Sequence, residues 1–254
     1  MEQVKLLSYY ELEEENRELK IMLSKLAHEM GNALTLLGAS IYYVEANITS
    51  KNVNCDISDL KNDYTYICNL FKELREYNQS DIIVKKEITV GEMISAIERA
   101  FARMKGSDDV SLIIYKQDNM LDKNIYADLV MLRQALINIL KNSIDAVEEN
   151  EDSKGKKIEI KIWVENISDC EIEDFGQENI SEVVHIEVAD NGKGIGDRYI
   201  SEIFKPMFTY GKKDGTGLGL SIVKKIVEKH KGKIKAVSVQ GTGTAIHIYF
   251  PILI

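Results

Sequence analysis

Several features that define other classes of protein are scarce in this sequence of 254 residues. It has three cysteines, an odd number without metal-type spacing, so we expect free thiols rather than a disulfide framework. Basic residues are outnumbered, with 32 Lys and Arg against 41 Asp and Glu, for a formal net charge of -9. Because nucleic-acid binding depends largely on cationic contacts to phosphates, nucleic acid is not an expected partner.

Long hydrophobic runs are also missing. The longest apolar stretch, residues 33–44, is shorter than the about 20 residues that a membrane-spanning helix needs, and it contains Ser, Thr, Gly and Tyr. Residues 1–20 lack the apolar core of a signal peptide. We therefore expect a cytoplasmic chain without a membrane span or a secretion signal.

The N-terminal third carries apolar side chains at helical spacing. No proline interrupts residues 9–47, where these side chains recur at intervals that trace one helical face. A polar turn is predicted at 50–58, and residues 57–77 repeat the helical pattern. We assign residues 1–84 to a helical hairpin. Because two antiparallel helices bury little apolar surface, we expect a homodimer that completes a four-helix bundle.

Residues 85–254 alternate between strand-like and helix-like patterns, which predicts an α+β domain in which helices cover one mixed sheet. The predicted strands are Ser111–Lys116, Ile158–Glu165, Val183–Asp190, Lys233–Val239 and Thr244–Phe250. The predicted helices are Gly91–Met104, Asp128–Glu148 and Gly217–His230. Three of the four histidines, His185, His230 and His247, lie in different predicted elements of this domain. We interpret them as structural, with His230 at a helix end where a cation would favour the helix dipole, and expect no zinc site.

One predicted helix has a polar stripe beside its apolar one. Gln134, Asn138, Asn142 and Asp145 recur at helical spacing on a second face of the helix 128–148. A carboxamide oxygen can ligate Mg²⁺, a hard ion that prefers oxygen ligands and usually keeps substrate phosphates. The stripe is therefore either a metal and phosphate site or a solvated helix face.

Two glycine-containing segments follow that helix. Asp190 ends a predicted strand before Asn191-Gly192-Lys193-Gly194, where a carboxylate could accept a hydrogen bond from the exocyclic amine of adenine, although a plain turn fits equally well. Residues 215–220, Gly-Thr-Gly-Leu-Gly-Leu, open a predicted helix. Free amides at a helix N-terminus form an anion site.

In this order, the three segments resemble the Bergerat-type ATP-binding fold of histidine kinases, gyrase-type topoisomerases, ATP-driven heat-shock chaperones and mismatch-repair ATPases. The N box is similar to Gln134–Ala146, the G1 box to Asp190–Gly194, the F box to Ile203–Phe208 and the G2 box to Gly215–Gly219. The resemblance implies that the domain 85–254 is an α/β sandwich that binds ATP and Mg²⁺.

By the same resemblance, Asn142 binds Mg²⁺, Asn138 supports the phosphates and Asp190 recognises adenine. Residues 193–216 resemble the ATP lid, in which Lys212 and Lys213 either contact the γ-phosphate or are solvated loop charges. The nucleotide-binding residues that the resemblance implies are Asn138, Lys141, Asn142, Asp190, Gly192, Gly194, Lys212, Lys213, Gly215, Thr216, Gly217, Leu218, Gly219 and Leu220.

Asn138 also bears on what the ATP is used for. The hydrolytic members of the superfamily carry at this position a Glu that activates water, and a carboxamide is not a base near neutral pH. Hydrolysis by direct attack of water is therefore disfavoured, and the phosphoryl group needs another nucleophile.

His28-Glu29-Met30-Gly31-Asn32 lies midway along the first predicted helix and resembles the H box of histidine kinases. By resemblance, His28 is the phosphoacceptor through Nε2 and Glu29 is the base. Asn32 lies one helical turn beyond His28 and could orient a water molecule for dephosphorylation of a response regulator. Ala33 replaces a proline that is common in the family, so a proline kink is not expected.

The resemblance implies a histidine kinase core that phosphorylates His28 and passes the phosphoryl group to an Asp of a response regulator receiver domain. Response-regulator phosphatase activity and a separate sensor protein as partner are further expectations. The alternative is a kinase-like phosphotransferase or scaffold without autokinase activity. A third interpretation, an ATPase that works by hydrolysis, is opposed by Asn138.

Overall fold

A computed structural model describes most of the chain as two compact units. The described residues are 29–44, 46, 58–79, 83–104, 109–118, 120–150, 155–169, 180–211 and 215–252. Unit 1 comprises Met1–Glu76 and Pro206–Leu218, and unit 2 comprises Tyr77–Lys205 and Gly219–Ile254. Three predicted site residues, His28, Lys212 and Lys213, lie outside the described residues.

Unit 1 contains two helical segments that match the periodicity of the sequence. Residues 29–44 are helical, and α2 spans Ser58–Gln79. The hydroxyl of Ser40 donates a hydrogen bond to Asp63 Oδ2 at 2.9 Å, so the first helix contacts α2. Ala33 and Leu70 are buried. The helices therefore agree with the predicted ones over these residues, and most of the predicted turn lies outside the described residues.

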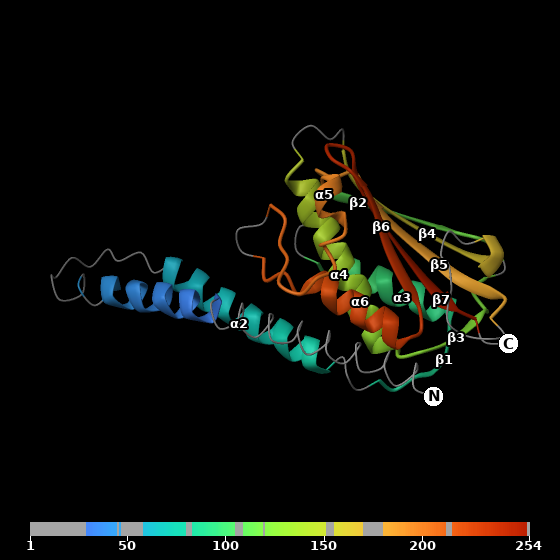
Figure 1. Ribbon diagram of the computed structural model, residues 1–254, viewed down its shortest axis with the longest axis horizontal. Helices are drawn as coiled ribbons and strands as arrows, with labels where there is room; N and C mark the ends of the chain where they lie inside the picture. Colours follow the sequence, from blue (N-terminus) through green and yellow to red (C-terminus); the bar gives the residue numbers. More distant parts are fainter. Residues whose placement is uncertain are drawn as a thin grey trace, which may run out of the picture. The chain divides into compact units, whose positions relative to one another are not determined.

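The core of unit 2 is a five-stranded sheet in the order β2-β4-β5-β7-β6 (Figure 1). β2 pairs in parallel with β4, and the other neighbours are antiparallel. The strands are β2 Val110–Lys116, β4 Lys156–Asn166, β5 Glu182–Asp190, β6 Lys233–Val239 and β7 Gly243–Pro251. All five strands were predicted, with ends that differ by two residues or fewer.

The structure also contains a two-stranded sheet that the sequence analysis missed. β1 Lys86–Thr89 pairs antiparallel with β3 Asn124–Ala127. Each strand has four residues, which is too short for an alternating pattern to be distinguished from a loop. Thr89 also caps the helix that follows: its hydroxyl accepts from the Glu92 amide, and the Glu92 carboxylate accepts from the Thr89 amide.

The helices of unit 2 lie on one face of the sheet (Figure 1). They are α3 Val90–Phe101, α4 Leu129–Glu148, the short α5 Asp197–Ile200 and α6 Gly219–Lys229. Asp128 caps α4 by accepting from the amides of Val130 and Met131, at 3.0 and 3.2 Å. The predicted α4 therefore begins and ends within one residue of the observed helix.

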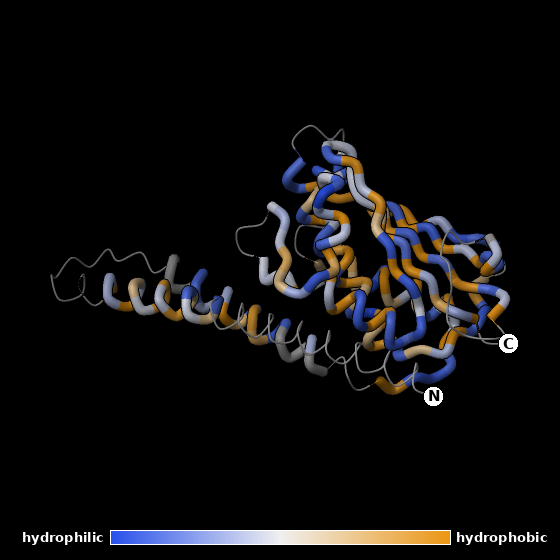
Figure 2. The backbone as a smooth tube through the Cα atoms, viewed as in Figure 1, coloured by the Kyte–Doolittle hydropathy of each residue, from blue (hydrophilic) through white to orange (hydrophobic). Residues whose placement is uncertain are grey.

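Alternate residues of the strands form the core beneath these helices, and the alternation is visible along the strands in Figure 2. Ile160 of β4, Val188 of β5 and Ile246 of β7 lie in one row across the sheet, and all three are buried. No helix in the described parts of the chain is long and apolar enough to cross a membrane.

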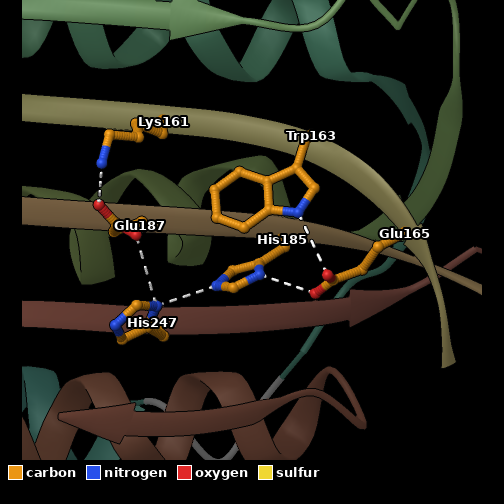
Figure 3. A network of polar contacts seen from close by, with 6 residues as sticks. All are labelled: Lys161, Trp163, Glu165, His185, Glu187 and His247. Carbon is orange, nitrogen blue, oxygen red and sulfur yellow. Dashed lines mark hydrogen bonds and ion pairs between the residues drawn. The ribbon is translucent and has the colours of Figure 1, made fainter. Parts of the chain in front are cut away.

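The opposite face of the sheet carries polar and aromatic side chains (Figure 3). His185 of β5 lies 2.7 Å from Glu165 Oε1 through Nδ1 and 3.1 Å from His247 Nδ1 through Nε2. The indole of Trp163 donates to Glu165 Oε2 at 3.2 Å, and Lys161 pairs with Glu187 at 2.7 Å. We name these six residues the outer-face network. The histidines at 185 and 247, which are separated in the sequence, are therefore in contact.

Candidate functional site

The polar stripe of α4 faces the beginning of α6 rather than solvent. Asn138 Nδ2 donates a hydrogen bond to the carbonyl oxygen of Gly219, at 3.4 Å. Asn142 Nδ2 lies 3.9 Å from the position that a Cβ atom would take on Gly219. Asn138 and Asn142 are half-buried, whereas Lys141 is exposed. The structure thus brings together two of the predicted segments, and it makes a solvated helix face the poorer interpretation of the stripe.

Gln134 belongs to the same stripe, one turn before Asn138. Its Nε2 atom is buried and has no hydrogen-bond partner among the described residues. A buried polar atom without a partner destabilises the free protein, because it has lost its hydrogen bonds to water. The polar side of α4 therefore contains a buried hydrogen-bond donor, Gln134 Nε2, that has no acceptor among the described residues.

Asp190 lies at the end of β5, where several donors converge on its carboxylate. Its Oδ1 accepts from the amides of Gly192 at 3.0 Å and Thr244 at 3.2 Å. Burial raises the pKa of Asp190, while hydrogen bonds from Gly192, the Ser143 side chain and Thr244 act in the opposite direction. The carboxylate is consequently held in one orientation in a desolvated place, where a further donor from a ligand would be favourable.

Gly192 allows the turn after Asp190 to pass against α4. The amide of the next residue, Lys193, donates to the carbonyl oxygen of Ala146 at 3.1 Å. A Cβ atom at Gly192 would lie 2.6 Å from the carbonyl carbon of Ala146, which is closer than real Cβ contacts allow. Gly194 has φ +65°, a conformation that favours glycine. Both predicted glycines are thus required by the geometry of this turn.

The remaining part of the glycine-rich segment, residues 215–218, belongs to unit 1. Gly217 has φ +71°, and a Cβ atom there would lie 2.5 Å from the carbonyl carbon of Met207. The hydroxyl of Thr216 bonds to the Glu73 carboxylate of α2, and Leu218 is fully buried. α6 then begins at Gly219, with Leu220 in its first turn.

The predicted phosphoacceptor segment is described from Glu29 onwards. Glu29 Oε2 accepts a hydrogen bond of 3.1 Å from the Tyr66 hydroxyl of α2, and Asn32 is exposed. The helix continues through Ala33 without interruption, which agrees with the expectation that no proline kink follows the motif.

Comparison with known proteins identifies the family of the domain that contains α4, β5 and α6. Residues 127–254, about half of the chain, match the family described as histidine kinase-, DNA gyrase B- and HSP90-like ATPases. The chain belongs to this family. The ATPase family match begins just before α4 and includes β5, α6 and the last strand, so it covers the residues that surround Asp190.

Several curated relatives that match most of the chain are named histidine kinases. The sensor histidine kinase ZraS of Salmonella typhimurium is 27% identical over 228 residues, covering 89% of this chain and 44% of that protein. The sensory histidine kinase/phosphatase NtrB of Rhodobacter capsulatus is 26% identical over 233 residues, covering 91% and 61%. The chain therefore spans less than two thirds of the length of either curated relative.

A solved structure resembles nearly the whole chain. The histidine kinase ThkA, in complex with the response regulator protein TrrA, has a TM-score of 0.68 and is 25% identical, covering 98% of this chain and 67% of that one. The structural likeness extends beyond the ATPase family domain to the helices of unit 1.

Some residues around the site of this ATPase domain were not predicted. Ser143 and the Thr244 amide both hold Asp190, and Asn191 braces the turn, donating to Gly155 O at 2.6 Å and accepting from the Lys157 amide at 2.8 Å. Asn191 lies within the segment Asp190–Gly194, and because Asn side chains often bond to nearby backbone, its role in the turn could have been predicted. Thr244 acts through its backbone, and no side-chain pattern could have identified it.

Proposed function

We propose that this chain is an ATP-dependent protein histidine kinase that phosphorylates His28. The observation that carries the proposal is Asn138: at the position where hydrolytic members of the superfamily have a Glu, a carboxamide is bound to the first residue of α6. A carboxamide does not take a proton from water near neutral pH. The site therefore favours an acceptor other than water, and His28 on the helical part of the same chain is the candidate.

The nucleotide would lie between α4 and the turn after β5. The half-buried carboxylate of Asp190 accepts a hydrogen bond from the exocyclic amine of adenine, and Gly192 lets the turn that carries this carboxylate pass against α4. The first turn of α6, with Gly219 and Leu220, offers backbone amides to phosphate oxygens. By the resemblance, Gly215, Thr216, Gly217 and Leu218 also bind phosphate, and Lys141, Lys212 and Lys213 contribute positive charge.

The residues present also suit a magnesium ion. Asn142 has a hard carboxamide oxygen and is half-buried beside Gly219, where phosphates would bind. A bound Mg²⁺ would neutralise the developing negative charge on the phosphates. Asn138 would orient the phosphates beside it.

The chemical step moves one phosphoryl group. Nε2 of neutral His28 attacks the γ-phosphorus, the bond from phosphorus to the β–γ bridging oxygen breaks, and ADP leaves with the electron pair of that bond. The attack leaves the ring cationic, and the proton on Nδ1 passes to the Glu29 carboxylate. The phosphoryl group then transfers from His28 to an Asp of a response regulator receiver domain, as the ThkA–TrrA complex leads us to expect.

A second activity, dephosphorylation of the response regulator, is supported by Asn32. Its side chain is exposed on the helix that carries Glu29, where it can orient a water molecule on a docked partner. The relative NtrB is named a kinase/phosphatase.

Exposed apolar side chains on both helices of unit 1 support a homodimer. Tyr42 on the first helix is 74% exposed, and Phe71 on α2 is 52% exposed. Packing of two hairpins into a four-helix bundle would cover such surface. In this proposal, residues 1–84 dimerise and carry His28, and residues 85–254 bind ATP. We propose the cytoplasm as its location, where ATP and response regulators occur, and a separate sensor protein as a further partner.

Incubation with γ-labelled ATP and Mg²⁺ tests the proposal, with the chain compared with His28→Ala and Asn142→Ala. We expect an acid-labile, alkali-stable label that both substitutions abolish, while Lys161→Ala, on the other face of the sheet, retains it. Label that persists in His28→Ala would identify another acceptor. Nucleotide binding without any label would instead favour a phosphotransferase or scaffold without autokinase activity. Release of inorganic phosphate at the rate at which ATP is consumed, without label on the protein, would favour an ATPase.

A further inference from the structure

Tyr66 connects α2 to the predicted base of the phosphorylation step. Its hydroxyl donates a hydrogen bond of 3.1 Å to Glu29 Oε2, across 37 residues of sequence, and both side chains are partly buried. Both residues belong to unit 1, and Glu29 directly follows His28 in the sequence. No sequence motif singled out Tyr66.

The chemistry of the pair suits it to hold a carboxylate in place. A Glu side chain on a helix surface has several rotatable bonds, and fixing them reduces its conformational entropy. A tyrosine is rigid, and a hydrogen bond to an ionised acceptor is stronger than one between neutral groups. The Tyr66 hydroxyl therefore selects one rotamer of Glu29 before any nucleotide is bound.

We propose that Tyr66 is a positioning residue for the phosphorylation of His28, and that its hydroxyl holds Glu29 in the orientation that accepts the imidazole proton. This inference rests on the proposed function. Glu29 Oε2 takes the hydrogen bond from Tyr66, and Oε1 takes the Nδ1 proton of His28 as the new nitrogen–phosphorus bond forms. Tyr66 keeps its own proton throughout, so the step needs no other reactant.

The hydrogen bond acts on Glu29 through its orientation. The donor keeps the carboxylate in place, and a base must first be within hydrogen-bond reach of the proton that it removes. A mobile carboxylate would spend most of its time in rotamers that do not reach the ring.

Another contact between the same helices provides a matched control. Ser40 donates to Asp63 Oδ2 at 2.9 Å, also from the first helix to α2, and neither residue has a role in the proposed chemistry. If the Tyr66 contact only joins the helices, Tyr66→Phe and Ser40→Ala should change the rate of labelling by the same factor. If Tyr66 positions Glu29, only Tyr66→Phe should change the rate.

The test measures initial rates of label on His28 at several ATP concentrations for the chain and for Tyr66→Phe, Ser40→Ala, Glu29→Gln and Tyr66→Phe/Glu29→Gln. We expect Glu29→Gln to lower kcat about 100-fold, the lower range of general-base effects, and Tyr66→Phe to lower it about 5-fold with the KM for ATP unchanged. The double variant should be no slower than Glu29→Gln, because Tyr66 acts only through Glu29.

Thermal unfolding of each variant accompanies the rates, so that a loss of folded protein is recognised. A Tyr66→Phe variant that labels at the rate of the unchanged chain overturns the inference but not the proposed function. So do equal rate losses in Tyr66→Phe and Ser40→Ala, or effects that multiply in the double variant. Absence of label on His28 in the unchanged chain overturns the proposed function together with this inference.

Discussion

The two faces of the five-stranded sheet use the same strands for different purposes. On β5, Ile186 and Val188 face the helices and are fully buried, and Asp190 continues that row to the proposed nucleotide site. His185 and Glu187 alternate with them and belong to the outer-face network (Figure 3). The helix-covered face thus combines an aliphatic core with one half-buried carboxylate at its end, whereas the polar groups of the outer-face network bond to one another.

The two faces also differ in how they hold a titratable group that is partly or fully removed from solvent. Asp190 is held by donors that keep its carboxylate ready for a ligand. His185 is only 5% exposed, and its two ring nitrogens already contact Glu165 and His247. Burial lowers the pKa of His185 to about 4, against an opposing effect of the neighbouring Glu165. His185 is therefore neutral at pH 7, with Nδ1 donating to Glu165.

The largest expected effect comes from removing an aliphatic side chain from the helix-covered face. Ile186→Ala should lower the free energy of unfolding by about 2 to 5 kcal/mol, the range for truncation of a buried Ile. Glu187→Gln, at the next residue but on the outer face, should lower it by less than about 1 kcal/mol, because its partner Lys161 is partly exposed. Urea unfolding of both variants checks the contrast, which equal losses would contradict.

Asp190→Asn should weaken nucleotide binding about 100-fold, because it removes a charged acceptor from a half-buried position, a loss of about 1.5 to 3 kcal/mol. The amide also presents a donor to the amides of Gly192 and Thr244. Titration with ADP and Mg²⁺ measures the effect, and Glu187→Gln on the same strand is the control. Unchanged affinity in Asp190→Asn would remove this residue from the nucleotide site.

Acid should weaken the protein through His185. The folded state keeps this ring neutral down to about pH 4, whereas the unfolded chain takes up a proton below the ordinary value of 6.5. The unfolded state binds more protons between these values, so stability is fully present above about pH 6.5 and falls as pH falls towards 4. His185→Phe should unfold with a shallower dependence on pH in that interval, although it is less stable at pH 7. An unchanged dependence would show that other groups are responsible.

The smallest effect is expected at the exposed edge of the same network. Lys161→Ala removes the ion pair with Glu187, in which the lysine side chain is 46% exposed. We expect the free energy of unfolding to change by less than about 1 kcal/mol, and the change to shrink further in high salt. A larger loss, measured by urea unfolding at low and high salt, would mean that the outer-face network depends on this charge.

Much of the fold could be predicted because the long elements have strong local patterns. α4 has 20 residues, and β4, β5 and β7 have 11, 9 and 9. Each is long enough for its helical or alternating pattern to repeat several times, so the period is unambiguous. The exceptions were β1, β3 and the short helix α5, whose four residues each carry too little pattern. Asp190, Gly192 and Gly194 were predicted as one group because they are adjacent in the sequence.

His230 shows where a local argument led to the wrong chemistry. Its position at the end of α6 suggested a cation that favours the helix dipole. In the structure, Nε2 accepts from the Asp128 amide at 2.9 Å, and Nδ1 donates to the Ile226 carbonyl oxygen at 2.7 Å. Burial lowers the pKa of His230, against the opposing Ile226 hydrogen bond. The ring is a neutral bridge between the start of α4 and the end of α6.

By itself, the sequence determined the long helices and strands and supplied the prediction of which residues bind ATP, because periodicity and short motifs are properties of neighbours along the chain. Tertiary structure alone decided that His185 touches His247, that Thr244 and Ser143 hold Asp190, and that Tyr66 reaches Glu29. These contacts depend on strand register and on how helices pack. Both are set by the burial of whole faces, which no single segment encodes.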